Sequence, residues 1–378
     1  MLRVVFTVSN DIFTDQRVNK MAQTLASMGF SPILAGVRFP ESLFFAPQYA
    51  RVWRMPVLFR KGFLFYAEIQ LRLLIYLLWV KTDLIVANDL DTLLPAQIAA
   101  RIRNKPLVYD THEYFTGVPD VAMRPLRRLV WGTLENWLFP MQKTILTVNH
   151  SIAQLYQKKY AKTLLVVRNL PRYRKPAQDA YFQIPGIEKH EAVILVQGSG
   201  LNKGRGIEEL ILAMKPEYGI RDAKLLIIGD GNAKKLLTEL VHAHQLHSRV
   251  IFMPRMHYQQ LCEYTSRATI GVSVDKPICI NYLYSLPNKL FDYIMAGLPV
   301  LASDLPEVQS IVEKYEVGLI CGQHDPASIA HSINRMLSDR DQLKKWRENC
   351  LEAAKTLNWE REEEIVKVVY GRFVANKS

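Results

Sequence analysis

Several features that mark specialised protein classes are scarce or missing in this sequence. Its 378 residues include four cysteines, which are widely spaced and form no CxxC pair, so neither a disulfide framework nor a zinc site is predicted. The sequence contains no internal repeat and no low-complexity tract. The apolar run from Leu2 to Val8 is too short for a signal peptide and predicts a buried first strand. We therefore expect a globular protein of the cytoplasm with free thiols.

Positive charge is unevenly distributed along the chain. The net charge is +12, and residues 1–168 hold 21 Lys and Arg against 11 Asp and Glu, whereas residues 169–378 hold 27 against 25. A field of one sign on the first half predicts an anionic partner for that half. Because no helix-turn-helix, RNP or zinc-finger pattern accompanies the charge, nucleic acid is not expected. The expected partner is an anionic membrane surface or a phosphate-bearing substrate.

Short β-branched runs alternate with amphipathic stretches, which is typical of βαβ units and parallel sheets. Prolines and basic residues interrupt this alternation at 169–190. The pattern predicts an α/β fold with two Rossmann-like domains. Strands are expected at 2–8, 31–37, 51–58, 83–88, 106–110, 143–148, 163–168, 192–197, 224–229, 249–253, 268–274, 298–302 and 317–321. The predicted parts are an N-terminal domain (1–170), a linker (171–190), a C-terminal domain (191–358) and a final helix (359–378) that packs back on the N-terminal domain.

The apolar segment 63–80 is close to the length that spans a bilayer. Glu68, Gln70 and Arg72 lie in its middle, where each would be costly in hydrocarbon. We therefore expect a helix that is buried or lies on a surface. The basic residues just before it stand among aromatic residues, which suits contact with an anionic membrane, although an ordinary core helix with a solvated basic flank is the alternative. These basic residues are Arg51, Arg54, Arg60 and Lys61.

A glycine-rich turn follows the strand expected at 192–197. Its backbone N–H groups and the next helix N-terminus would face a phosphate, and Lys203 and Arg205 add positive charge. The glycine spacing differs from the dinucleotide fingerprint, so an NAD site is not predicted. A plain structural turn is the alternative. The turn residues expected at the phosphate site are Gly198, Ser199 and Gly200, with Gly229 in the turn after the next strand.

The segment 287–300 begins with Pro287, which suits the first turn of a helix. Asn288 and Lys289 then lie near the positive end of this helix, and Asp292 follows one turn later. A cation and a carboxylate on one helix face suit a diphosphate and a ribose. A solvated ion pair would show the same spacing.

Titratable residues also follow a strand in the first half. Asp110, His112 and Glu113 stand at the end of the strand expected at 106–110, and this set suits proton chemistry or hydroxyl binding. No second histidine or carboxylate cluster completes a metal-ligand set, so no bound metal is expected.

Two further polar groups lie near strand ends in this half. Asn10, Asp11 and Arg17 follow the first strand, where they would face a substrate or cap the first helix. The segment 88–91 follows another strand and is interpreted as a helix cap.

These motifs resemble those of glycosyltransferase family 4, also called group 1. The strongest match runs from Ser285 to Tyr293 and continues from Ala296 to Val300. Lesser matches are 15–18, 109–113, 168–169, 204–207 and 229–231. The resemblance covers nearly the whole chain. It implies the GT-B fold, in which two Rossmann-like domains face each other across a cleft, and a retaining enzyme that binds a nucleoside-diphosphate sugar in its C-terminal domain and needs no metal.

The resemblance also implies roles for single residues. Arg205 matches the basic residue that neutralises the donor diphosphate, and Asp292 matches the glutamate that binds the ribose. Tyr284 stands where the family has another glutamate, so Asn288 and Lys289 are expected to take over its contacts with sugar or phosphate.

Other residues extend the expected site. His112 matches a histidine beside the donor sugar, and Glu307 matches an acidic residue on the donor side. We expect His112, Arg205 and Lys289 to act in catalysis. The residues expected on the acceptor side are Asn10, Asp11, Arg17, Asp110 and Glu113.

The expected function is transfer of a hexose-type sugar from a UDP- or GDP-sugar to a hydroxyl of a glycan or lipid-linked acceptor. Synthesis of cell-envelope or exopolysaccharide glycans is the expected context. Two alternatives share the pattern: a sugar-nucleotide 2-epimerase of the same fold, and a non-catalytic nucleotide-sugar-binding protein. The expected location is the cytoplasm, with contact to the inner face of the membrane.

Overall fold

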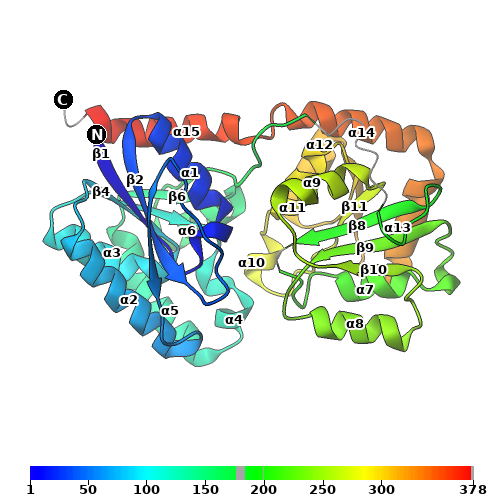
Figure 1. Cartoon of the computed structure of the whole chain (residues 1–378), viewed down its shortest axis with the longest axis horizontal. Coiled ribbons are helices and arrows are strands. Elements are labelled where there is room, and N and C mark those ends of the chain that lie inside the picture. Colours follow the sequence, from blue (N-terminus) through cyan, green and yellow to red (C-terminus); the bar gives the residue numbers. More distant parts are fainter. Residues whose placement is uncertain (176–183, 199, 376–378) are drawn as a thin grey trace. The chain divides into compact units, whose positions relative to one another are not determined.

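The computed structural model describes residues 1–175, 184–198 and 200–375. They form two compact α/β units. Unit 1 comprises Met1–Asn169 and Trp359–Ser378, and unit 2 comprises Leu170–Asn358. The chain therefore leaves unit 1, builds unit 2, and then contributes one more helix to unit 1 (Figure 1).

Unit 1 contains a seven-stranded parallel sheet in the order β3-β2-β1-β4-β5-β6-β7. The strands are β1 (Leu2–Thr7), β2 (Phe30–Arg38), β3 (Arg51–Pro56), β4 (Leu84–Asn88), β5 (Leu107–Thr111), β6 (Thr144–Thr147) and β7 (Leu165–Val166). The α-helices are α1 (Gln16–Ser27), α2 (Gly62–Trp79), α3 (Leu90–Ile102), α4 (Pro119–Ala122), α5 (Pro125–Leu138), α6 (His150–Tyr160) and α15 (Trp359–Ala375), with short 3-10 helices η1 (Ile12–Thr14), η2 (Phe115–Gly117) and η3 (Phe139–Met141). Every residue of β4 is buried, because helices cover both faces of the sheet.

Unit 2 contains a six-stranded parallel sheet in the order β10-β9-β8-β11-β12-β13. The strands are β8 (Ala192–Gly198), β9 (Ala223–Gly229), β10 (Val250–Met253), β11 (Ile270–Ser273), β12 (Val300–Ser303) and β13 (Gly318–Cys321). The helices are α7 (Ile207–Ala213), α8 (Lys234–Ala243), α9 (Tyr258–Arg267), α10 (Ile280–Leu283), α11 (Asn288–Met295), α12 (Pro306–Tyr315), α13 (Pro326–Ser338) and α14 (Arg340–Ala354), with the 3-10 helix η4 (Pro216–Tyr218).

The strand order reverses once in each sheet. In unit 1, β1 lies between β2 and β4, and in unit 2, β8 lies between β9 and β11. Open α/β sheets bind ligands at the carboxyl ends of the strands that flank such a reversal. The loops that follow β1 and β4 in unit 1, and β8 and β11 in unit 2, are therefore where a site is expected.

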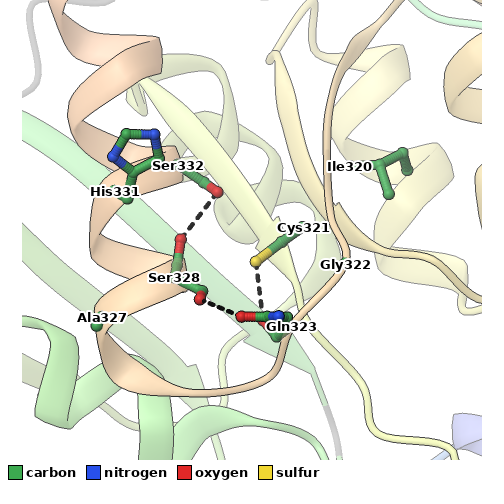
Figure 2. A pocket seen from close by; sticks show the side chains of 8 residues that line it. All are labelled: Ile320, Cys321, Gly322, Gln323, Ala327, Ser328, His331 and Ser332. Carbon is green, nitrogen blue, oxygen red and sulfur yellow. Dashed lines mark hydrogen bonds between the residues drawn. The ribbon is translucent and has the colours of Figure 1, made fainter.

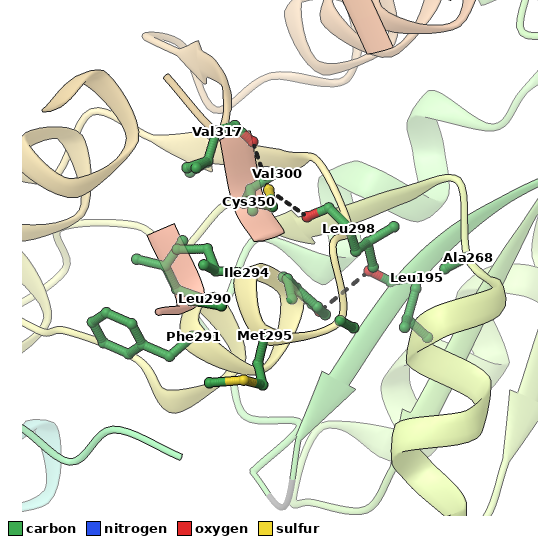
Figure 3. Close-up of a cluster of buried hydrophobic side chains, with 14 of the residues drawn as sticks. Leu195, Ala268, Leu290, Phe291, Ile294, Met295, Leu298, Val300, Val317 and Cys350 are labelled. Atoms are coloured by element: carbon green, nitrogen blue, oxygen red, sulfur yellow. Dashed lines mark hydrogen bonds between the residues drawn. The ribbon is translucent and has the colours of Figure 1, made fainter. Parts of the chain in front are cut away.

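The core of unit 2 fixes the orientation of α11. Leu290, Phe291, Ile294 and Met295 are buried in one apolar cluster (Figure 3). Because one side of this short helix is held in the core, the polar residues Asn288, Lys289 and Asp292 fall on its other side.

Helix α15 completes the core of unit 1. Trp359, Val366, Val369 and Tyr370 are buried in the cluster that also contains Met21 of α1. The Trp359 indole donates a hydrogen bond to Thr24 Oγ1 at 3.0 Å. The carboxylate of Glu362 accepts from the Arg168 guanidinium at 2.6 and 2.9 Å. Residues 359–375 are therefore part of unit 1 although they follow unit 2 in sequence.

The predicted α/β architecture with two parallel sheets is confirmed, and the predicted strands overlap the observed ones. The strand expected at 163–168 is reduced to Leu165–Val166. Part of the segment expected to be a linker belongs to unit 2, because Ile184 and Ile187 are buried in its core beside Leu170. Residues 176–183 of that segment lie outside the described residues.

Helix α2 lies on unit 1 with one buried stripe. Phe65, Ile69, Leu73 and Leu77, spaced four residues apart, are buried. Among the described residues, α2 is the one helix that is long and apolar enough to cross a membrane by length and composition, with a mean hydropathy of 1.3. Its buried stripe packs on unit 1, and 22% of the 18-residue segment is buried.

Candidate active site

Close backbone packing shapes the loops at the carboxyl edge of the unit 2 sheet. Gly206, at the start of α7, has φ 69°, and a Cβ there would lie 2.0 Å from the Val274 carbonyl oxygen. A Cβ on Gly229 would lie 1.9 Å from the Gly198 carbonyl oxygen. Only glycine allows these approaches. The predicted phosphate turns therefore hold the loops after β8, β9 and β11 against one another.

Two cations from different loops meet at one carboxylate. Arg205 Nη1 lies 3.3 Å from Asp275 Oδ1, and Lys289 Nζ lies 3.2 Å from Asp275 Oδ2. The Arg205 guanidinium also stacks 4.1 Å above the centre of the Tyr282 ring. Arg205 follows β8, Asp275 follows β11 and Lys289 starts α11, so the strand reversal brings the predicted diphosphate-binding residues together.

Burial and charge act against each other in this group. Burial alone would raise the pKa of Asp275, but Lys289 and Arg205 hold it below its ordinary value. Burial lowers the pKa of Lys289 in spite of the neighbouring Asp275 carboxylate. The Lys289 side chain is only 12% exposed and the Arg205 side chain 26% exposed. Arg205 is therefore the more accessible of the two cations.

Asp292 lies one turn after Lys289 and receives protein hydrogen bonds. The Tyr258 hydroxyl donates to Asp292 Oδ1 at 2.7 Å, and Gln197 Nε2 donates to Oδ2 at 3.5 Å. Gln197 is itself fixed, because Thr265 Oγ1 donates to its Oε1 at 2.7 Å. The carboxylate predicted to bind a ribose is thus held at the end of β8.

The other predicted donor-side residues occupy the same edge of the unit 2 sheet. Asn288 is exposed at the first position of α11, and Glu307 is half-buried in the first turn of α12. Gly200 lies in the loop after β8, where its carbonyl accepts from Asn202 N at 2.9 Å. Tyr284 follows α10 and is half-buried. Ser199 lies outside the described residues.

Arg17 and Asp110 form a buried ion pair in unit 1. Arg17 Nη2 lies 2.7 Å from Asp110 Oδ1, and the two side chains are 2% and 0% exposed. Arg17 Nη1 also donates to the Val167 carbonyl at 2.5 Å. These residues were expected to contact an acceptor, but in this structure they lie beneath the surface. The acceptor-side role of this pair stays a prediction, and the structure shows the two side chains bound to each other.

His112 lies between two carboxylates at the ends of β4 and β5. Its Nδ1 is 3.4 Å from Asp89 Oδ2, and its Nε2 is 3.6 Å from Asp110 Oδ2. Burial alone would lower the pKa of His112, but the two carboxylates raise it to about 9. The two carboxylates therefore favour the protonated form of the ring. The Asp89 carboxylate accepts from the His112 backbone N–H at 2.7 Å, which gives Asp89 a role beyond its position at the start of α3.

The remaining acceptor-side residues have partners of their own. Asp11 accepts from Arg54 at 2.7 Å and from Phe13 N at 3.1 Å, so it caps η1. Asn10 donates from its amide to Asp15 Oδ2 at 3.0 Å. Glu113 is half-buried just after β5. Asp110 and Glu113 stand with His112 at the end of β5, while Asn10 and Asp11 lie on the loop after β1.

Asp275 and Asp91 are buried carboxylates near the predicted residues that the sequence analysis does not select. Asp91 is 7% exposed and accepts a short hydrogen bond from Ser9, while its Oδ1 has no hydrogen-bond partner among the described residues. Burial raises the pKa of Asp91 to about 6. Both acids stand just after a strand, and that position is the one signal in the sequence that could have identified them.

A surface cavity of about 420 Å³ lies beside β13 and α13 (Figure 2). Its polar groups bond to one another, since Cys321 Sγ donates to the Gln323 carbonyl and Ser328 Oγ donates to Gln323 Oε1, both at 3.0 Å. Its lining contains none of the predicted site residues. Within the described parts of the chain, no group of three or more His, Cys, Asp or Glu side chains is placed to hold a metal ion.

Two doubly wound sheets, with charged loops at each strand reversal, define an α/β protein whose ligand sites are expected at those reversals. Residues 177–356 match the family model of group 1 glycosyl transferases, and residues 15–169 match that of glycosyltransferase family 4. The chain belongs to this family of glycosyltransferases, whose fold is GT-B.

Similar proteins include an uncharacterized glycosyltransferase of Methanocaldococcus jannaschii, 30% identical over 156 residues. That alignment covers 41% of this chain and 38% of the relative. The chain spans about two fifths of the length of the curated relatives it matches.

Solved structures share the fold over almost the whole chain. Sucrose-phosphate synthase from Thermosynechococcus elongatus has a TM-score of 0.81 at 18% identity, covering 100% of both chains. HepE from Anabaena, solved with UDP and glucose, has a TM-score of 0.72 at 15% identity, covering 98% of this chain and 100% of that chain.

Proposed function

We propose that the protein moves a hexose-type sugar from a UDP- or GDP-sugar to a hydroxyl acceptor, with retention at the anomeric carbon. The observation that carries this proposal is the meeting of Arg205 and Lys289 at the carboxyl edge of the unit 2 sheet. Two cations beside glycine turns suit a diphosphate. The complex of HepE with UDP supports the same ligand class for this fold.

Catalysis then depends on charge that grows on the leaving diphosphate. As the bond from the anomeric carbon to the phosphate oxygen breaks, Arg205 and Lys289 stabilise the developing negative charge. The acceptor oxygen bonds to the same face of that carbon, and its proton passes to the departing phosphate oxygen. This step requires a well-placed acceptor more than a strong base. Bound metal is not needed, because the two side chains supply the positive charge.

The other residues orient the donor and the acceptor. Asp292, fixed by Tyr258 and Gln197, would accept hydrogen bonds from the ribose hydroxyls. Asn288 and Glu307 would contact the donor sugar from the starts of their helices. His112, whose pKa Asp89 and Asp110 raise, would donate a hydrogen bond to a sugar hydroxyl. Asp110, Arg17 and Glu113 would hold the His112 loop in place.

The proposed acceptor is a glycan or a lipid-linked saccharide at an anionic membrane. Helices α2 and α5 touch through an edge contact between Tyr66 and Trp131, with ring centres 5.2 Å apart. Both helices, together with α3, lie on the same side of the unit 1 sheet (Figure 1). Their outer sides expose large apolar residues, which we call the α2–α5 face: Phe63, Leu64, Leu71, Ile75, Trp79, Leu126, Leu129, Val130 and Trp137. Exposed apolar groups of this extent suit insertion among lipid headgroups.

Donor binding and turnover test the proposal directly. Thermal shift against UDP, GDP, ADP and their sugar conjugates should identify the base, and hydrolysis or transfer should persist with EDTA.

Arg205→Ala and Lys289→Ala should each lower turnover about 10²-fold and weaken binding of the nucleoside diphosphate. Asp292→Asn should mainly raise the donor KM. The exposed Lys235→Ala on α8 serves as the matched control and should leave both quantities unchanged.

The products separate the proposal from its alternatives. A transferase releases one nucleoside diphosphate for each sugar moved, whereas a 2-epimerase returns an isomerised sugar nucleotide. A non-catalytic protein would bind the donor and leave it intact over long incubation with a mixture of glycan and lipid-linked acceptors. Near-normal turnover of both Arg205→Ala and Lys289→Ala would reject the proposed donor site.

A further inference from the structure

Asp275 joins the two cations of the donor site through a carboxylate that is 1% exposed. Its Oδ1 faces Arg205 at 3.3 Å, its Oδ2 faces Lys289 at 3.2 Å, and Ser273 Oγ donates to Oδ2 at 3.2 Å. These contacts join residues from the loop after β8, the end of β11 and the first turn of α11. No other carboxylate in the described chain forms ion pairs with either cation.

The backbone around Asp275 is also fixed. Its carbonyl accepts from Ser303 Oγ at 2.7 Å and lies 3.1 Å from His324 Nε2. The next residue, Lys276, donates its N–H to the Gly204 carbonyl at 2.8 Å, just before Arg205. The carboxylate is therefore anchored to the sheet and to the glycine turn, unlike a mobile surface counter-ion.

Removing the Asp275 carboxylate would leave the positive charges of Arg205 and Lys289 without their shared counter-ion. The charged groups that shift the pKa of Lys289 are Asp275 and Arg205. Burial and Arg205 both lower the pKa of Lys289, and Asp275 is the group that raises it. His324 contacts the backbone carbonyl of Asp275 at 3.1 Å. Without Asp275, Lys289 would lose its proton at a lower pH.

We propose that Asp275 is a positioning residue that keeps Lys289 protonated and holds it beside Arg205 as a two-cation cradle for a diphosphate. The proposal rests on the proposed function of this site. Two positive charges and one negative charge leave the cradle with a net positive charge, so the carboxylate orders the cations without cancelling their attraction for the ligand.

Binding of UDP as a function of pH tests this role. Calorimetric titration between pH 7.5 and pH 9 keeps the UDP phosphates ionised throughout. The dissociation constant of the wild type should change by less than about 3-fold over this range. That of Asp275→Asn should rise about 10-fold or more as Lys289 deprotonates. Glu239→Gln, an exposed carboxylate on α8, is the matched control and should behave as the wild type.

A second substitution makes the result specific to the charge of Lys289. Arginine stays protonated at all these pH values. Asp275→Asn combined with Lys289→Arg should therefore show a flat pH profile again, whatever its absolute affinity. Equal weakening of UDP binding by Asp275→Asn at both pH values would overturn the proposal, since a merely structural defect acts in that way.

Competitive chemical labelling of lysines measures Lys289 without any ligand. Its titration midpoint should fall by about one pH unit or more in Asp275→Asn, and an unchanged midpoint would also overturn the proposal. If the wild type bound no nucleoside diphosphate at all, the proposed function would fail. The labelling shift would still decide whether Asp275 controls the charge of Lys289.

Discussion

Buried charges in unit 1 are held at a cost to stability. Asp91 is almost fully buried, and its pKa of about 6 lies above its ordinary value of 3.8. A carboxyl group whose pKa is higher in the folded state makes a contribution to stability that is present below the unfolded pKa and is lost as the pH rises through the folded pKa. At neutral pH the ionised Asp91 therefore destabilises unit 1.

Asp91→Asn should accordingly stabilise the protein at pH 8. The expected gain in the free energy of unfolding is about 1–3 kcal/mol at pH 8 and close to zero at pH 4, where the folded wild type already carries the proton. Urea unfolding at the two pH values measures it. Asp120→Asn, at a carboxylate that is 62% exposed, is the control and should change little at either pH. If Asp91→Asn raised the free energy of unfolding equally at both pH values, ionisation of Asp91 would not be what destabilises the wild type.

Single residues also show what the sequence can and cannot reveal about the site. The motif from Ser285 to Val300 led to Lys289 and Asp292, because their spacing on one helix is local information. The ion pairs between Asp275 and Arg205, and between Arg17 and Asp110, connect residues far apart in the chain. Only the strand order brings them together, so neither pair could be predicted from spacing.

Some turns between elements require glycine, either for its positive φ or for its lack of a side chain. Gly206 and Gly219 both have positive φ values, 69° and 73°. A Cβ on Gly206 would meet the Val274 carbonyl oxygen at 2.0 Å, whereas one on Gly219 would have Asn334 Nδ2 at 4.0 Å as its nearest neighbour. The two glycines therefore share a left-handed backbone conformation, but only Gly206 lacks room for a side chain.

Gly206→Ala should destabilise the protein by about 3 kcal/mol, because backbone strain and a clash add together. Gly219→Ala, the matched control, should cost only the strain, about 1 kcal/mol. Thermal or urea unfolding of the two variants compares them. Gly206→Ala should also weaken UDP binding, since the loop that carries Arg205 must move. Equal losses for the two variants would show that the contact with Val274 is unimportant.

Longer elements were predictable because their patterns repeat. The observed strands β8 to β13 all overlap their predicted ranges. The short helices α4 and α10 span four residues each, too few to show a periodic pattern in the sequence. The extent of the linker was also overestimated: Ile184 and Ile187 stand among polar residues in sequence, but the fold buries them.

At the scale of the whole molecule, the charge asymmetry and the α2–α5 face occur in the same unit. Phe63 and Trp79 are 77% and 84% exposed. Arg60 and Lys61 precede α2, and Arg128 lies in α5. Arg54, which was expected to share in membrane contact, is instead paired with Asp11 and only 10% exposed. The structure therefore corrects the set of basic residues that can face a membrane.

Vesicle co-sedimentation tests whether the α2–α5 face binds an anionic membrane. The protein should pellet with anionic vesicles at low salt and leave them at high salt, since each basic residue near the surface contributes about 1 kcal/mol of screened attraction. Replacing Arg60, Lys61 and Arg128 with Ser should reduce pelleting and preserve UDP binding. The same change at Lys235, Lys344 and Lys345 in unit 2 is the control. A wild type that stays in the supernatant at low salt would rule out the membrane contact.

The return of α15 to unit 1 has a consequence for how the protein is made. A ribosome adding about 5–20 residues per second needs about 10–40 s to synthesise the chain of unit 2, and only afterwards does Trp359 emerge. During that interval the nascent unit 1 lacks the helix that covers Met21 and its neighbours. Any stall or premature stop within unit 2 leaves this apolar surface uncovered, so incomplete chains would be recognised by chaperones and proteases through the missing α15.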